Sequence, residues 1–222
     1  MELSLQNRMI LIPLFQGMSK NELTQVIGQT KLRFDKYAKG EVIHQENDAC
    51  DHLMFLIDGE IDAISYADDR SYRVEERFAP PYTLQTEHFF GLTQRYTRTF
   101  VAHTACSFVS IDKNDMLKLT DDFIILRLNL LNIISTTAQK AMRKPWRHRA
   151  STLRQQITRF FEERCSRPTG AKTFRIKIAQ LAAELHESRL NVSQELNRMR
   201  GEGLLQFTRG IISIESLERL RT

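Results

Sequence analysis

The spacing of apolar residues changes along the chain, and each change predicts a different kind of element. The opening segment carries apolar residues at helical spacing, interrupted around Pro13 and Gly17, which predicts two short helices. Between residues 41 and 111, short runs alternate apolar and polar residues, separated by turn sequences such as Asp58-Gly59-Glu60 and Pro80-Pro81. Many short strands at nearly regular spacing predict an antiparallel roll or barrel.

A helical period returns between Asn114 and Met142, which predicts one long helix. Its apolar residues alternate by three and four positions over about three heptads, the pattern of a coiled-coil seam. This seam consists of Met116, Leu119, Phe123, Leu126, Leu130 and Ile133. We expect the seam to face a second copy of the chain while the remaining apolar positions pack on the roll. The alternative is a helix packed entirely on its own domain. Lys144-Pro145 is the expected hinge, because the residue before a proline is biased away from helix.

The spacing of apolar residues in the C-terminal part predicts helices separated by short breaks. A first helix from Arg149 to Cys165 is followed by a short strand and by apolar residues at helical spacing in 178–185. A break at His186-Glu187 precedes Ser188, which is a good N-cap because its hydroxyl can accept from the free N–H groups of the first turn. These signals predict a helix, a turn and a second helix.

The second of these helices carries a polar face that is poor core material. Gly201 and Gly203 are expected to end it, and residues 206–214 are expected to form a two-stranded hairpin that turns near Arg209-Gly210. The polar face consists of Arg189, Asn191, Gln194, Asn197 and Arg198. Such side chains suit the major groove of DNA.

Charge is distributed unevenly along the 222 residues. Residues 143–222 hold 17 Lys and Arg against 8 Asp and Glu, a net charge of +9, whereas residues 1–142 hold 15 against 19, a net charge of −4. The two sums restore the net charge of +5 for the whole chain. The asymmetry indicates that only the C-terminal part meets a polyanion.

Other function classes find little support in the sequence. The three cysteines, Cys50, Cys106 and Cys165, are too few for a disulfide framework or a four-ligand metal site, so we expect reduced thiols in a cytoplasmic protein without a metal. No apolar run approaches the roughly 20 residues that cross a bilayer, and no signal peptide is recognisable at the N-terminus. Phosphate-binding, zinc-protease and nucleophile-elbow motifs are also missing, so we expect no catalytic residues and no enzyme activity.

Two separate segments resemble one family of regulators. Residues 39–48 and 53–61, with a glycine-bearing turn before each of two strands, resemble the opening of cyclic-nucleotide-binding β-rolls. Residues 188–199 and 203–205 resemble the recognition helix and wing of the Crp/Fnr transcription regulators. Roll, long helix and winged helix-turn-helix follow in that family's order, so the resemblance covers nearly the whole chain.

The resemblance implies an α+β fold in three parts. Residues 1–112 would form a sensor domain, an antiparallel β-roll of the double-stranded β-helix type. Residues 113–144 would form the dimerisation helix and hinge, and residues 145–222 the DNA-binding domain. A homodimer would bind a palindromic operator in double-stranded DNA through the 188–199 recognition helix, with RNA polymerase as a further partner and no membrane partner.

The segment that binds the cyclic nucleotide in the family departs from its pattern here. Members that bind cyclic AMP carry a glycine-glutamate pair on a short helix, then an arginine and a serine or threonine. In residues 88–100 Leu92 stands where the glutamate belongs, and the segment is too short for that helix. The remaining candidate effector-binding residues are Gly91, Arg95, Arg98 and Thr99. We expect a roll that does not bind cyclic AMP, with no cofactor and an unknown effector.

Two alternatives stay open, and a third has little support. The roll could be a scaffold in a constitutively DNA-competent regulator, or it could sense a cyclic nucleotide with a degenerate cassette. An enzyme is a distant third.

The family's docking mode assigns roles to residues of the second helix and the wing. Arg189 would contact guanine, Asn191 or Gln194 would pair with adenine, and Leu190 would touch a thymine methyl. Phosphate contacts are expected from Ser188, Ser193, Arg198, Thr208 and Arg209. For Arg198 the alternative is an ion pair with Glu195 or Glu202 on its own helix. His186 occupies the turn position where the family usually has glycine, so a positive φ is expected there.

Overall fold

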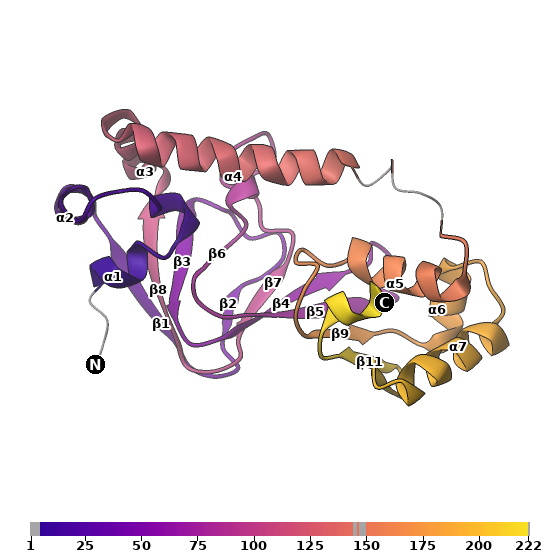
Figure 1. Cartoon of the computed structure of the whole chain (residues 1–222). Helices are drawn as coiled ribbons and strands as arrows, with labels where there is room; N and C mark the ends of the chain where they lie inside the picture. Colours follow the sequence, from indigo (N-terminus) through magenta and orange to yellow (C-terminus); the bar gives the residue numbers. More distant parts are fainter. Residues whose placement is uncertain (1–4, 144–145, 147–149, 222) are drawn as a thin grey trace. The chain divides into compact units, whose positions relative to one another are not determined.

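The chain divides into two compact units in the computed structural model of Figure 1, which describes residues 5–143, 146 and 150–221. The first unit comprises Met1–Ile61 and Phe78–Pro145, and the second comprises Asp62–Arg77 and Trp146–Thr222. The expected hinge at Lys144-Pro145 lies outside the described residues. These units differ from the expected three-part division in two respects: residues 113–144 group with the N-terminal residues, and residues 62–77, expected in the roll, group with the C-terminal residues.

The first unit is built around two antiparallel groups of strands. In one group the order is β1-β8-β3-β6, and in the other β2 pairs with β7. The strands are β1 (Arg33–Tyr37), β2 (Val42–His44), β3 (His52–Asp58), β6 (Tyr82–Thr83), β7 (Thr99–Ala102) and β8 (Cys106–Asp112). Helices α1 (Leu5–Met9) and α2 (Lys20–Gln29) precede them, with the 3-10 turns η1 (Pro13–Phe15) and η2 (Thr86–His88). The antiparallel roll is therefore confirmed, while strand β1 was not predicted.

Burial explains why β3 and β8 are the central strands of the larger group. Four consecutive residues of β3, 53–56, are buried, so this strand is covered on both faces. In β8, residues 108–111 are buried in the same way, and Leu53 lies opposite Ile111 in the antiparallel register. Runs of apolar residues without alternation are the sequence signature of strands buried on both faces.

The turn after β3 requires a glycine at position 59. Gly59 has a φ of +82°, and a Cβ built on it would lie 2.3 Å from the carbonyl oxygen of Ala105 and 2.7 Å from the Cα of Cys106. Both neighbours are backbone atoms that cannot move away without disturbing β8.

Replacing Gly59 with alanine is therefore expected to lower the free energy of unfolding by about 2 kcal/mol or more. Gly28→Ala is the matched control, because Gly28 lies inside helix α2 and a Cβ there has no neighbour within 4 Å. The control should raise the stability by about 0.5–1 kcal/mol. Urea denaturation of both variants measures the difference, and equal stabilities would contradict the assigned turn.

The expected single long helix is instead two helices, α3 (Lys113–Asp122) and α4 (Ile124–Arg143). Phe123 between them has φ −123° and ψ 100°, outside the helical region. Arg127 stabilises the break, because its Nε donates to the carbonyl of Thr120 at 2.6 Å and its guanidinium pairs with Asp121 at 3.0 Å. These bonds satisfy groups that the end of a helix leaves without partners.

The predicted dimer seam is wrong for most of its residues, because their side chains pack within one copy of the chain. Buried residues of the seam are Met116, Leu119, Phe123, Leu126 and Leu130, while Ile133 is half-buried. The side of α4 that carries Asn129 faces the N-terminal segment, where its Nδ2 donates to the carbonyls of Leu14 and Gln16 at 3.0 and 2.8 Å. The residues expected to pack on the roll include three that are exposed instead: Ile124, Leu128 and Leu131.

The second unit contains the predicted helices and hairpin, each close to its expected position. Its sheet has the order β10-β11-β9-β5-β4. The strands are β4 (Ile61–Tyr66), β5 (Arg73–Phe78), β9 (Lys172–Arg175), β10 (Gln206–Thr208) and β11 (Ile211–Ile214). The helices are α5 (Leu153–Glu163), α6 (Ile178–Glu184) and α7 (Arg189–Gly201), with a final 3-10 turn, η4 (Leu217–Arg221).

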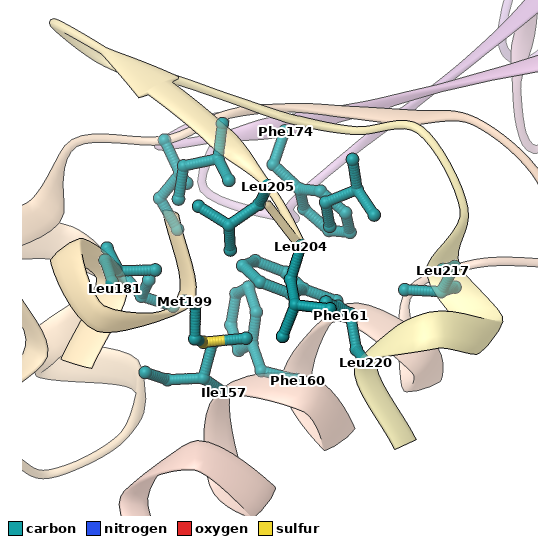
Figure 2. Close-up of a cluster of buried hydrophobic side chains, with 14 of the residues drawn as sticks. Ile157, Phe160, Phe161, Phe174, Leu181, Met199, Leu204, Leu205, Leu217 and Leu220 are labelled. Atoms are coloured by element: carbon teal, nitrogen blue, oxygen red, sulfur yellow. The ribbon is translucent and has the colours of Figure 1, made fainter. Parts of the chain in front are cut away.

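One apolar core holds the elements of the second unit together. Figure 2 shows the side chains of Phe160 and Phe161 from α5 directed toward those of Met199 from α7 and of Leu204 and Leu205 beyond it. Phe161 and Phe174 stack at a tilt, with ring centroids 4.4 Å apart. Because this core joins α5, α6, α7 and the sheet, it fixes how the polar face of α7 is presented.

Candidate nucleic-acid interface

Helix α7 presents a buried side and a polar exposed side. Val192, Leu196 and Met199 recur at spacings of four and three residues and are buried in the core. The opposite side is exposed and carries Arg189, Leu190, Asn191, Gln194, Asn197 and Arg198, while Ser193 is half-buried at its edge. The leucine is informative, because a large apolar side chain left 66% exposed within this polar face has no core to join. This side therefore carries the four residues that the sequence assigns to base contacts, which are Arg189, Leu190, Asn191 and Gln194.

The turn that precedes α7 has the predicted geometry. His186 has a φ of +54°, and the N–H of Glu187 donates to the carbonyl of Ala182 at 2.9 Å. Ser188 is the N-cap, and its hydroxyl accepts from the N–H of Asn191 at 3.1 Å. The turn and the cap together set the direction in which the first turn of α7 leaves the domain.

Removing the N-cap provides a direct test of this local geometry. Ser188→Ala is expected to lower the free energy of unfolding by about 1 kcal/mol, because an N–H group of the first turn loses its acceptor. Ser193→Ala is the control, since Ser193 lies inside the helix and alanine has the higher helix propensity. Chemical denaturation measures both, and a destabilisation by Ser193→Ala as large as that by Ser188→Ala would contradict the assignment.

A groove of about 740 Å³ lies between the start of α6, the start of α7 and the β10–β11 hairpin. Three cationic residues line it, Lys177, Arg189 and Arg209, together with Thr208. The hairpin turns at Arg209-Gly210 as predicted, with Gly210 at a φ of +81° and Thr208 paired with Ile211. Three positive charges around an open groove suit an anionic partner.

Lys177 is a lining residue that the sequence reasoning missed. It is the N-cap residue of α6, without a side-chain cap hydrogen bond. A lysine immediately before a predicted helix was the available signal, since the start of such a helix often faces the phosphates of a bound nucleic acid.

Ion pairs hold the exposed side of α7 in place. Arg154 of α5 donates to Glu195 at 2.8 Å and to Glu202 at 2.5 and 2.8 Å. The hydrogen bonds from Glu202 and Glu195 raise the pKa of Arg154 above its ordinary value. Arg198 lies 3.4 Å from Glu195, so the expected alternative for this residue, a pair on its own helix, is present. Its side chain is 72% exposed, so exchanging this partner for a phosphate would cost little.

Two of the candidate effector residues, Arg95 and Thr99, have hydrogen-bond partners within the first unit. Arg95 donates to the carbonyl of Asn47 at 2.6 Å, and the hydroxyl of Thr99 accepts from the N–H of Glu46 at 3.2 Å. Gly91 is exposed with a φ of +98°, and Arg98 is half-buried. No helix occurs between η2 and β7, as expected from the short segment. Leu92 points fully into solvent.

Aromatic side chains fill the space beneath this segment. The rings of Phe89, Tyr96 and Phe100 are almost completely buried. Tyr96 packs edge-on against Phe100 with centroids 5.9 Å apart, and it stacks on His44 at 4.4 Å. The interior of the first unit next to residues 89–100 is therefore occupied by its own side chains.

The described part of the chain includes all three cysteines. Cys50, Cys106 and Cys165 are buried, and none of the three is in a disulfide. No group of three His, Cys, Asp or Glu side chains within residues 5–143 and 150–221 is arranged to hold a metal ion. Among the helices that the structure describes, none combines the length and the apolar character needed to cross a membrane.

Comparisons with known proteins agree with this architecture. Residues 34–123 match the family model of the cyclic nucleotide-binding domain, and no curated protein sequence matches the chain. Among solved structures, the sensor domain of the transcriptional regulator DNR from Pseudomonas aeruginosa is 18% identical, with a TM-score of 0.51 over 67% of this chain and 94% of that chain.

Two further solved structures resemble a larger share of the chain with lower scores. The Thermus thermophilus catabolite activator protein is 18% identical over 94% of this chain and 96% of its own, with a TM-score of 0.48. FixK2 from Bradyrhizobium japonicum is 16% identical over 86% and 96%, with a TM-score of 0.47. Residues 34–123 therefore match the cyclic nucleotide-binding domain by sequence, and the sensor domain of DNR resembles this chain in fold.

Proposed function

We propose that the chain is a DNA-binding transcription regulator of the Crp/Fnr type, without enzyme activity, that binds a palindromic operator as a homodimer. The observation that carries the proposal is the polar exposed side of α7, which begins at Arg189 beside a groove that Lys177 and Arg209 also line. A helix whose first turn is exposed, polar and flanked by cations is the arrangement that places side chains against base edges in the major groove.

The contacts divide into two classes by position. Side chains on the exposed side of α7 read bases: Arg189 a guanine, Asn191 or Gln194 an adenine, and Leu190 a thymine methyl. Phosphate contacts come from the rim of the groove and the flanks of the helix. They are assigned to Ser188, Ser193, Arg198, Thr208 and Arg209, with Lys177 added from the groove geometry.

The homodimer uses an apolar stripe on α4 that the sequence had assigned to the roll. Ile124, Leu128 and Leu131 are 60%, 50% and 53% exposed, although they are large apolar residues. The spacing of four and three continues through Ser135, Ala138 and Met142, all exposed. An exposed heptad seam of this length supports pairing with the same seam of a second copy. The two recognition helices of a dimer would then reach half-sites about one helical turn apart.

The roll is proposed not to bind cyclic AMP. Arg95 is committed to the carbonyl of Asn47, and Leu92 replaces the glutamate that holds the ribose in the family's cyclic-AMP binders. The family match of residues 34–123 supports the second candidate function, a regulator that responds to a cyclic nucleotide through a degenerate cassette. RNA polymerase is the proposed further partner, since a regulator of this type changes transcription by helping or hindering that enzyme.

Titration of duplex DNA of mixed sequence with the full chain tests the proposal. Fluorescence anisotropy should show binding at low salt that weakens steeply as salt rises, because phosphate contacts release counterions. Adding cyclic AMP should leave the affinity unchanged. Tighter binding with cyclic AMP would favour the second candidate, and an absence of DNA binding at every salt concentration would contradict both.

A further inference from the structure

A segment from the middle of the chain is built into the second unit as a strand. Strand β5 pairs antiparallel with β9, with Val74 opposite Phe174, Glu75 opposite Thr173 and Glu76 opposite Lys172. Side chains alternate across this pair: Val74 and Phe174 are buried in the apolar core, while Glu75 and Arg175 form an ion pair on the outer face. Alternation of this kind is what a strand needs to belong to a sheet rather than to touch its edge.

A buried ion pair joins the two strands. Glu76 and Lys172 lie 2.9 Å apart, and each side chain is only 1% exposed. The carboxylate of Glu76 also accepts from the N–H and the hydroxyl of Ser166, both at 2.9 Å, and from the N–H of Arg167 at 3.3 Å. A buried lysine is tolerated only with a partner, so losing the carboxylate would remove the charge that Lys172 faces at 2.9 Å in the core.

The same hairpin contacts the residues that position the candidate helices. The Nε of Arg164, at the end of α5, donates to the hydroxyl of Tyr72 at 2.6 Å. The Nη2 of the same guanidinium donates to the carboxylate of Glu184, in the last turn of α6, at 2.9 Å. This guanidinium lies 3.7 Å from the centre of the Phe160 ring. Strand β9 leads directly through Ile176 to Lys177, the N-cap of α6.

Residues 62–77 also connect the units covalently. The chain enters the second unit at Asp62, leaves it after Arg77 and returns to it after residue 145. Three peptide connections therefore join the units, and two of them flank the hairpin.

We propose that the hairpin 62–77 is a coupling strand: docking of β5 on β9 holds α6, α7 and the β10–β11 hairpin in the arrangement that binds DNA. The first unit then acts on DNA binding through this strand. The inference rests on the proposed DNA-binding function, and part of its test is independent of DNA. If β5 undocks in some molecules, the apparent affinity for DNA equals the affinity of the docked form multiplied by the fraction of molecules that remain docked.

The test uses the full chain with three kinds of variant. Glu76→Gln removes the charge that faces Lys172. Asp69→Asn is the matched control, because Asp69 is an exposed acid at the hairpin turn that accepts from the N–H of Ser71 within the same turn. The cysteine pair Glu75→Cys with Thr173→Cys places two thiols on opposed residues, at a separation that allows a disulfide. Asp69→Cys with Thr173→Cys is its control. The cysteine pair is also combined with Glu76→Gln.

Expected results separate strand docking from general folding. The 75–173 pair should close on mild oxidation, as seen by altered gel mobility, and the 69–173 pair should not. Glu76→Gln should weaken DNA binding by about tenfold or more, Asp69→Asn should not, and closing the disulfide should restore the affinity of the Glu76→Gln protein.

Each opposite result overturns the proposal: failure of the 75–173 pair to close, normal DNA binding by Glu76→Gln, loss that the disulfide does not restore, or loss of DNA binding when the disulfide alone is closed. If no protein binds DNA, wild type included, the proposed function fails. In that case, disulfide closure and a comparison of the thermal transitions of Glu76→Gln and Asp69→Asn still test whether β5 is docked on β9.

Discussion

Replacing Leu128 and Leu131 with aspartate is expected to turn a dimer into a folded monomer and to weaken binding to a palindromic duplex by at least about a hundredfold. Both side chains are about half exposed in the single chain, so the monomer tolerates the charges. In the proposed dimer the four aspartates would face one another across the α4 seam, where charge is strongly unfavourable. Each monomer would then bind a half-site through its single recognition helix, without a second helix bound to the other half-site.

Two control variants make this result specific. Thr136→Asp adds a charge to an exposed position of α4 outside the seam and should leave both the dimer and DNA binding intact. Leu126→Ala removes a side chain that is buried within one copy, so it should lower the stability of the monomer by about 2–5 kcal/mol. Sedimentation analysis and DNA titration measure the outcomes. A double aspartate variant that stays dimeric would contradict the assigned seam.

Replacing Arg189 with alanine is expected to remove the preference for one base pair in each half-site, with a loss of about 1–3 kcal/mol there. Arg189 stands in the exposed first turn of α7, where a guanidinium can bond the O6 and N7 atoms of guanine. Arg209 lies at the turn of the β10–β11 hairpin, so Arg209→Ala should weaken binding to every sequence similarly and lower the salt dependence by about one phosphate contact.

Titrations with an operator selected from random duplexes and with mixed-sequence DNA distinguish a base contact by Arg189 from a phosphate contact by Arg209. Arg219→Ala is the control, since this exposed arginine lies in η4 and does not line the groove. If Arg189→Ala weakened operator and mixed-sequence DNA equally, its assignment to a base would be wrong.

Local signals in the sequence predicted the candidate interface well. Ser188 as an N-cap, a positive φ at His186 and the turn at Arg209-Gly210 all depend on a few neighbouring residues, and each is present as expected. The exposed polar side of α7 also follows from helical spacing alone. Lys177 was missed because its place in the groove depends on α7 and the β10–β11 hairpin, which are distant in sequence.

Three features could not be predicted from the local sequence pattern. Apolar residues occur on several sides of α4, and their spacing alone does not indicate which side packs on the roll. The prediction therefore placed the buried residues in the dimer seam and the exposed residues against the roll. The pairing of β5 with β9 joins residues about a hundred positions apart, and nothing in the alternation of residues 73–78 indicates which strand they will join. The helix breaks at Phe123, where Arg127 donates to the carbonyl of Thr120 at the end of α3. The apolar spacing of the sequence does not indicate this contact.

Selection of bound duplexes from a random pool is the most direct test of the central claim that the α7 face of a homodimer reads DNA. We expect enrichment of a palindrome whose half-sites are centred about one helical turn apart. When Arg189→Ala is used in the same selection, one base pair per half-site should no longer be selected. Enrichment of no sequence, or of a single asymmetric site unaffected by Arg189→Ala, would contradict the claim.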